Sequence, residues 1–252
     1  MNTQGIVKLL SNLNLTCLML VMTSHVGATG ELPRFQARDV FDLEYAAEPA
    51  VSPDGKHIIF ARRSFDIMTD STRSSLWIAR AARTDSASAG AESNSTEPLL
   101  ADGENYRSVR WSPDGSRIAY LAQSQGKTQI WVRWMDTGRS AVISQLEYSP
   151  RSLTWSPDGS QLAFLMDLPD DNKPLKVSMP DKPKGAKWSE PVRYVAEARY
   201  QRDGRGIVDP AWTHLFVIPA EGGTPRQVTH KNVDQGGTLA WAADGQSVFM
   251  AA

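Results

Sequence analysis

Aspartates recur in this 252-residue chain in a pattern that could suggest acid–base or metal chemistry. Carboxylates act as general acids or bases, or as metal ligands, when a fold brings several of them together. Each of these aspartates precedes a glycine in a similar local context, so we expect equivalent turns on one face. Side chains at equivalent turns cannot converge on one substrate, and we interpret them as structural. The five are Asp54, Asp114, Asp158, Asp203 and Asp244.

The patterns that usually carry catalysis do not occur in the sequence. A hydrolase nucleophile elbow needs Gly-x-Ser-x-Gly, which is absent. His57, His214 and His230 stand far apart and do not match zinc-site spacings. Gly204-Arg205-Gly206 is too short for a phosphate-binding loop. The sequence therefore predicts no catalytic residue, no metal site and no cofactor in this chain.

A repeated turn sets the elements that would position any functional residue. Proline presets φ, aspartate bonds nearby amides, and glycine takes the left-handed conformation that closes the turn. Three copies follow a tryptophan, whose large apolar body suits packing between sheets. An apolar strand is expected after each copy, over 57–60, 117–121, 161–165 and 247–250. The copies are Ser52-Pro53-Asp54-Gly55, Ser112-Pro113-Asp114-Gly115, Ser156-Pro157-Asp158-Gly159 and Ala242-Ala243-Asp244-Gly245.

The spacing of the turns predicts the fold. Asp114 and Asp158 are 44 residues apart, and Asp158 and Asp244 are 86 apart, about twice that period. A period of about 40–45 residues is typical of four-stranded propeller blades. A degenerate copy, Asp203-Gly204, falls near the middle of the long interval. The sequence therefore predicts an all-β fold, an incomplete β-propeller over 29–252 with four blades and the start of a fifth.

Further segments fit this plan. Residues 83–97 are small and polar, and predict a loop inserted between two outer strands of the first blade. Residues 167–191 are rich in Pro, Lys and Asp and are expected to form an exposed loop. Third strands are predicted at 76–78, 130–132 and 215–217, with a weaker candidate at 175–177. Fourth strands are predicted at 141–144 and 226–229.

The first 28 residues resemble a secretory signal peptide. Lys8 is the one charge, an apolar segment follows, and Val26-Gly27-Ala28 fits a small-x-small cleavage site. Polar residues interrupt the apolar run, so we expect no stable membrane insertion. Export to the periplasm or the exterior is predicted, and cleavage would remove Cys17, the one cysteine. The alternative is an ordinary buried N-terminal helix. The net charge of -1 and the scattered basic residues suggest no nucleic-acid partner.

Several segments carry a family resemblance. Residues 185–191, 198–206, 214–218 and 222–229 resemble bacterial serine peptidases of the prolyl oligopeptidase family, in the acylaminoacyl-peptidase and dipeptidyl-aminopeptidase branch. The resemblance covers about residues 35 to 252. It implies a propeller that precedes an α/β-hydrolase domain with a Ser-Asp-His triad and admits short peptides to it. No position matching the triad is present, so we expect a truncated N-terminal portion that is inactive alone.

The resemblance also implies where substrate contacts would lie. In some branches the propeller supplies charged residues that hold the N-terminus of the substrate. The candidates here are Glu197, Arg199 and Tyr200, beside the degenerate turn at Asp203-Gly204. The alternative is that this departure from the repeat only marks a different blade junction.

The sequence is compatible with three functions. The first is the gating propeller of an exported serine oligopeptidase, with the hydrolase domain of the parent chain and short peptides as its partners. The second is a periplasmic propeller of the TolB type, which binds partner proteins and has no enzyme attached. The third is a truncated product without function. The Trp-Ser-Pro-Asp-Gly turn occurs in both kinds of propeller and does not separate them.

Overall fold

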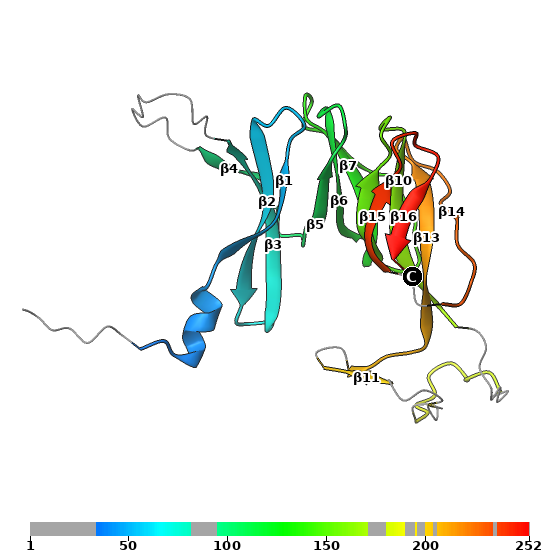
Figure 1. Cartoon of the computed structure of the whole chain (residues 1–252). Helices are drawn as coiled ribbons and strands as arrows, with labels where there is room; N and C mark the ends of the chain where they lie inside the picture. The colour runs from blue at the N-terminus through cyan, green and yellow to red at the C-terminus, as the bar shows by residue number, and fades with distance from the viewer. Residues whose placement is uncertain are drawn as a thin grey trace, which may run out of the picture. The chain divides into compact units, whose positions relative to one another are not determined.

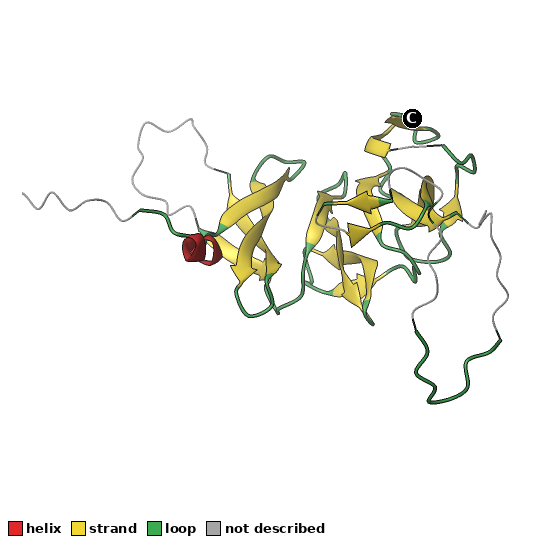
Figure 2. Cartoon of the chain, turned by 90° about the horizontal axis from the view of Figure 1, so that it is seen from below, coloured by secondary structure: helices red, strands yellow, loops and turns green. Residues whose placement is uncertain are grey.

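The computed structural model describes residues 34–81, 95–170, 180–189, 195, 200–203, 206–233 and 236–251. The predicted signal peptide, residues 1–28, lies outside the described residues. The chain divides into two compact units, Met1–Val40 and Phe41–Ala252. A short 3-10 helix, η1 (Ala37–Asp42), is the single helix of the described residues, and the regular structure after it is β (Figure 2).

Three antiparallel four-stranded sheets follow one another along the chain, and each is a blade (Figure 1). Blade 1 has the order β1-β2-β3-β4, blade 2 the order β5-β6-β7-β8, and blade 3 the order β9-β10-β13-β14. A pair, β15-β16, begins a fourth blade. The propeller fold predicted from the repeat is therefore confirmed. The strands are β1 (Tyr45–Val51), β2 (His57–Asp66), β3 (Ser71–Arg80), β4 (Thr96–Leu100), β5 (Arg107–Trp111), β6 (Arg117–Ser124), β7 (Lys127–Trp134), β8 (Ser140–Val142), β9 (Pro150–Trp155), β10 (Gln161–Pro169), β13 (Ala211–Pro219), β14 (Arg226–Gln227), β15 (Gly236–Trp241) and β16 (Val248–Ala251).

The repeated turn joins the first two strands of each blade. In blade 2, Ser112 Oγ donates to Asp114 Oδ1 at 2.6 Å and accepts from the Arg117 amide at 2.9 Å. The Gly115 amide closes the turn on the Ser112 carbonyl, and Gly115 has a φ of 73°. Blades 1 and 3 repeat these bonds around Ser52 and Ser156. The aspartate carboxylates are thus engaged within their own turns, as the structural interpretation predicts.

The number of blades differs from the prediction. Asp203 lies in a small hairpin of β11 (Gln201–Arg202) and β12 (Gly206–Ile207), which pairs with no blade among the described residues. This hairpin belongs to an excursion between β10 and β13, which are paired neighbours in blade 3. The excursion, residues 170–210, is about as long as a blade. Its length therefore matched one period of the repeat, and the sequence predicted an additional blade there. The described residues therefore form three blades and the start of a fourth.

The same excursion changes the blade to which one predicted strand belongs. The segment 215–217 is a third strand, as predicted, but it belongs to blade 3 as part of β13. Residues 175–177, the weaker candidate for that position, lie outside the described residues. Of the predicted insertion over 83–97, residues 83–94 lie outside the described residues, and its last two residues, Thr96 and Glu97, begin β4, the strand that pairs with β3.

Apolar side chains fill the spaces between successive blades. One cluster lies between blades 1 and 2, a second between blades 2 and 3, and a third between blade 3 and β15-β16. Alternate residues of a central strand face opposite neighbours: Tyr120 belongs to the first cluster and Leu121 to the second. Aromatic pairs across the central strands strengthen these layers, as in the stacked rings of Phe164 and Phe216 at 5.6 Å.

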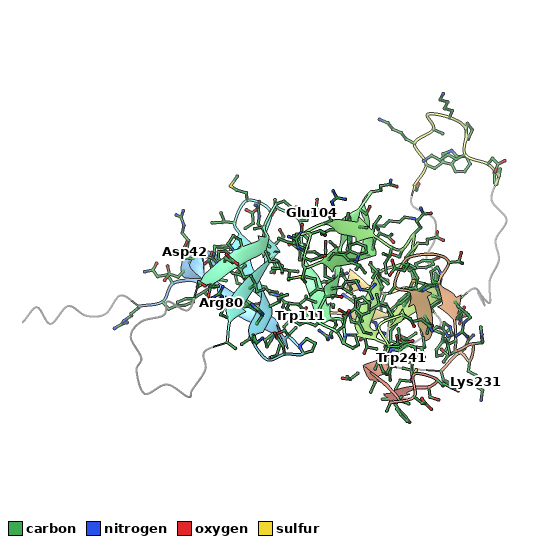
Figure 3. All side chains as sticks on the ribbon, turned by 90° about the horizontal axis from the view of Figure 1, so that it is seen from above. Asp42, Arg80, Glu104, Trp111, Lys231 and Trp241 are labelled. Carbon is green, nitrogen blue, oxygen red and sulfur yellow. The ribbon has the colours of Figure 1, made fainter. Side chains whose placement is uncertain are left out.

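A hydrogen bond from a tryptophan joins each blade to the one before it. Trp111 Nε1 donates to the Ala50 carbonyl at 3.0 Å, and Trp155 Nε1 donates to the Arg110 carbonyl at 3.0 Å. Trp241 Nε1 lies 3.4 Å from the Thr154 carbonyl (Trp111 and Trp241 are labelled in Figure 3). The tryptophan of the repeat therefore holds the first strands of neighbouring blades together, in addition to its apolar packing.

Candidate ligand groove on the inner strands

The first strands of the blades contact one another in succession, β1 with β5, β5 with β9 and β9 with β15, and we call them the inner strands. Each carries an irregularity in its pairing with the next strand of its own blade. In three blades a residue with positive φ lies there, always six positions before the turn aspartate: Glu48 (53°), Ser108 (56°) and Ser152 (57°). A non-glycine residue in the left-handed region is uncommon and marks a constrained backbone. Its recurrence shows that the bulge is part of the repeat.

The Glu48 carboxylate accepts a hydrogen bond from the bulge of the following blade. Its Oε2 accepts a hydrogen bond from the Ser108 amide at 2.6 Å, and its Oε1 accepts one from the Arg63 guanidinium. The carboxylate is half-buried between the two blades. The bulge at Ser108 therefore turns a backbone N–H away from its own sheet and toward an anion on the preceding blade.

A pocket of about 660 Å³ extends over these bulges. Its lining comes entirely from the inner strands β1, β5 and β9, so three blades contribute to it. Three charged side chains are present, Glu48, Arg110 and Arg151, together with the two bulge serines. The remaining lining residues are Pro49, Ala50, Val51 and Trp111.

The charged residues of the pocket differ in their pairing. Glu48 is neutralised by Arg63, as described above. Arg151 Nη2 donates to Asp167 Oδ1 at 2.9 Å and to Thr213 Oγ1 at 2.7 Å. Arg110 Nη1 donates to the neighbouring Val109 carbonyl at 2.8 Å, and among the described residues it forms no ion pair. The guanidinium of Arg110 is thus the positive group of this pocket that no described carboxylate balances.

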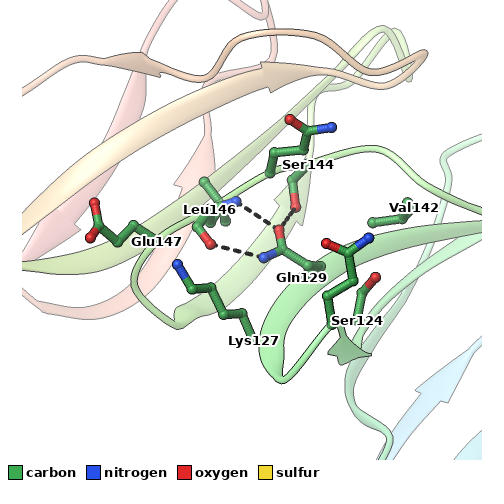
Figure 4. A pocket seen from close by; sticks show the side chains of 9 residues that line it. Ser124, Lys127, Gln129, Val142, Ser144, Leu146 and Glu147 are labelled. Carbon is green, nitrogen blue, oxygen red and sulfur yellow. Dashed lines mark hydrogen bonds between the residues drawn. The ribbon is translucent and has the colours of Figure 1, made fainter. Parts of the chain in front are cut away.

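A second pocket, of about 590 Å³, lies beside blade 2 and is lined by residues 124–129 and 142–147 in part (Figure 4). Gln129, which lines this pocket, is buried and forms hydrogen bonds through both polar atoms of its side chain. Its Nε2 donates to the Leu146 carbonyl, and its Oε1 accepts from the Leu146 amide and from Ser144 Oγ (Figure 4). These bonds hold the connection from β8 to β9 in place. We therefore interpret Gln129 as structural and place the candidate site in the inner-strand pocket.

Of the three residues predicted for substrate contact, Tyr200 is the one that the structure describes, and it lines neither pocket. Glu197 and Arg199 lie outside the described residues, and their role stays a prediction. Tyr200 precedes the β11–β12 hairpin with 45% of its surface exposed, and its carbonyl accepts from the Val208 amide. The inner-strand residues were missed because their types differ from blade to blade. The sequence feature that could have identified Glu48, Ser108 and Ser152 is their constant offset of six residues before the turn aspartate.

Comparisons with known proteins show which proteins this propeller is similar to. No family model matches the chain. The uncharacterized peptidase YuxL of Bacillus subtilis is 26% identical over 219 residues, which are 86% of this chain and 31% of that protein. This chain is similar to the propeller portion of a peptidase. The predicted resemblance to the N-terminal propellers of prolyl oligopeptidase family peptidases is thus confirmed. The chain spans about a third of the length of that relative.

Two further comparisons bear on the fold of this peptidase-like propeller. The acylaminoacyl peptidase of Pyrococcus horikoshii superposes with a TM-score of 0.56 at 15% identity, over 85% of this chain and 29% of that one. At this identity the match supports the fold. The Tol-Pal system protein TolB of Pseudomonas aeruginosa is 43% identical over 49 residues, which are 19% of this chain and 11% of that protein.

Among the described residues of this propeller, His, Cys, Asp and Glu side chains form no group of three that could hold a metal ion. The helical part of the described chain contains no segment long and apolar enough to cross a bilayer.

Proposed function

We propose that this chain is the propeller that admits short peptides to the active site of an exported serine peptidase. In this proposal an α/β-hydrolase domain with a Ser-Asp-His triad belongs to the same parent protein and is the partner of the propeller. The proposal places the protein in the periplasm or outside the cell, after removal of residues 1–28 as a signal peptide.

The similarity to YuxL carries the proposal. The aligned region includes nearly the whole chain and about a third of that peptidase, which leaves room there for a catalytic domain beside a propeller. The inner-strand pocket adds a physical argument. It places charged and backbone hydrogen-bonding groups on the strands that face the propeller axis, where a peptide passing through a propeller would meet them.

The reading frame beyond residue 252 tests the proposal. We expect a Gly-x-Ser-x-Gly nucleophile elbow within a few hundred residues. The full-length protein should hydrolyse peptide p-nitroanilides of a few residues and leave folded proteins intact, while the 252-residue chain should hydrolyse neither. A frame that only adds propeller blades and then stops would contradict the proposal, as would hydrolysis by the 252-residue chain.

The similarity to TolB favours one second candidate. That match is short but has a higher identity than the match to YuxL. Under this alternative the chain belongs to a propeller that binds partner proteins without hydrolysing them. Affinity capture with full-length protein, followed by a peptidase assay of the same preparation, separates the two functions.

A further inference from the structure

Glu48 shows what kind of group an inner-strand bulge binds. Its carboxylate accepts the Ser108 amide at 2.6 Å, a short hydrogen bond of the charge-assisted kind. The left-handed φ of Ser108 directs that N–H away from its own sheet and toward the preceding blade. Between blades 1 and 2, the anion that accepts this N–H is therefore the protein's own Glu48 carboxylate.

Between blades 2 and 3, the bulge recurs at Ser152, but no carboxylate corresponds to that of Glu48. Ser152 is the counterpart of Ser108, with the same offset from the turn aspartate and a φ of 57°. Ser108 in turn is the counterpart of Glu48, and its short hydroxyl side chain carries no charge. The chain therefore supplies no carboxylate of its own from that position to the Ser152 amide, although both serines line the same pocket.

Arg110 adds a charge at this place. It lies two residues after Ser108 on β5, lines the pocket, and forms no ion pair among the described residues. Its backbone is fixed, because Trp155 Nε1 donates to its carbonyl. A guanidinium binds a carboxylate through parallel hydrogen bonds, which a backbone amide can supplement.

We propose that the inner-strand pocket binds a ligand carboxylate, held by the Arg110 guanidinium and the Ser152 amide, one blade after the Glu48 carboxylate. The carboxylate can belong to the C-terminus of a short peptide or to a small non-peptide acid. The choice of a peptide rests on the proposed function above. The carboxylate chemistry rests on the pocket alone.

Calorimetric titration of the 252-residue chain distinguishes these sources. The ligands are trialanine, trialanine C-terminal amide and glutarate. We expect trialanine to bind and the amide to bind about tenfold more weakly, since the amide loses the charge-assisted contact. Equal binding of trialanine and its amide, or no binding of any ligand, would overturn the carboxylate site. Binding of glutarate without trialanine would support the site and contradict the peptide function.

Two variants place the ligand in the pocket. Arg110→Gln should weaken trialanine binding about tenfold, whereas Arg139→Gln removes an exposed arginine outside the pocket and should leave the affinity unchanged. Ser108→Glu repeats Glu48 one blade later and should abolish binding, because its own carboxylate would take the ligand position. Far-UV circular dichroism establishes that each variant is folded. Wild-type affinity in folded Ser108→Glu would refute the proposal even if Arg110→Gln did not fold.

Discussion

The indole Nε1 of Trp155 donates to the backbone carbonyl of Arg110 at 3.0 Å, so a residue of blade 3 fixes the backbone of a pocket residue in blade 2. The guanidinium of Arg117 lies over the Trp155 ring at 5.1 Å and donates to the Gly159 carbonyl at 3.0 Å. The same tryptophan therefore takes part in the apolar layer, in a hydrogen bond between blades and in a cation–π contact.

Replacing Trp155 with phenylalanine should separate these roles. Trp155→Phe retains an aromatic ring but removes the N–H donor, which leaves the Arg110 carbonyl without this partner. We expect a loss of about 1 kcal/mol in the free energy of unfolding, measured by urea denaturation. Trp188→Phe is the control, because Trp188 is 44% exposed. Equal unfolding midpoints for Trp155→Phe and the wild type would show that the hydrogen bond contributes nothing.

The turn aspartates should make the stability of the protein sensitive to acid. Hydrogen bonds from Ser112 and then Ser116 lower the pKa of Asp114 from 3.8 to about 2. A carboxyl whose pKa is lower in the folded state stabilises that state above the unfolded pKa, and this contribution is lost as the pH falls from about 4 to about 2. Ser112→Ala should raise the pKa of Asp114 in a carboxyl NMR titration and reduce the acid sensitivity. Ser116→Ala should produce a smaller rise. Identical Asp114 titrations in wild type and Ser112→Ala would disprove this account.

Gly159 tests the conformational demand of the repeated turn. It has a φ of +69°, and a Cβ there would meet Arg117 Nη2 and Pro113 Cδ at 3.6 Å, which is ordinary contact. The cost of Gly159→Ala should therefore come from the left-handed backbone, about 1–2 kcal/mol of unfolding free energy. Gly236→Ala is the matched control, since its φ lies outside that region and its Cβ would meet no atom within 4 Å. If both variants unfold at the same urea concentration, strain at the turn is not the cause.

The sequence predicts the turns well because their chemistry is local. Asp54, Asp114, Asp158 and Asp244 each precede a second strand that starts close to its expected position. The prediction that Asp203 belongs to the turn of a further blade is wrong. Any tight hairpin favours Asp-Gly, and the excursion that contains this hairpin has the length of one repeat. Only the direct pairing of β10 with β13 reveals that the excursion is an insertion.

The pocket could not be predicted in the same way. Glu48, Ser108 and Ser152 share an offset and a backbone conformation, but a left-handed φ in a non-glycine residue leaves no pattern in composition. The approach of Glu48 to Ser108 joins residues 60 positions apart, and it depends on how two sheets pack. Glu197 and Arg199 lie outside the described residues, so their predicted contact with substrate stays a prediction.

The repeat tryptophans Trp111, Trp155 and Trp241 each bond to a backbone carbonyl and not to a side chain. The acceptor residues in succession are Ala50, Arg110 and Thr154, which share no side-chain chemistry. Mutation at these positions can therefore change the side chains on the inner strands and keep the hydrogen bonds between blades. A propeller built this way can acquire a new ligand specificity through substitutions at a few inner-strand positions. The packing of its blades does not have to change with them.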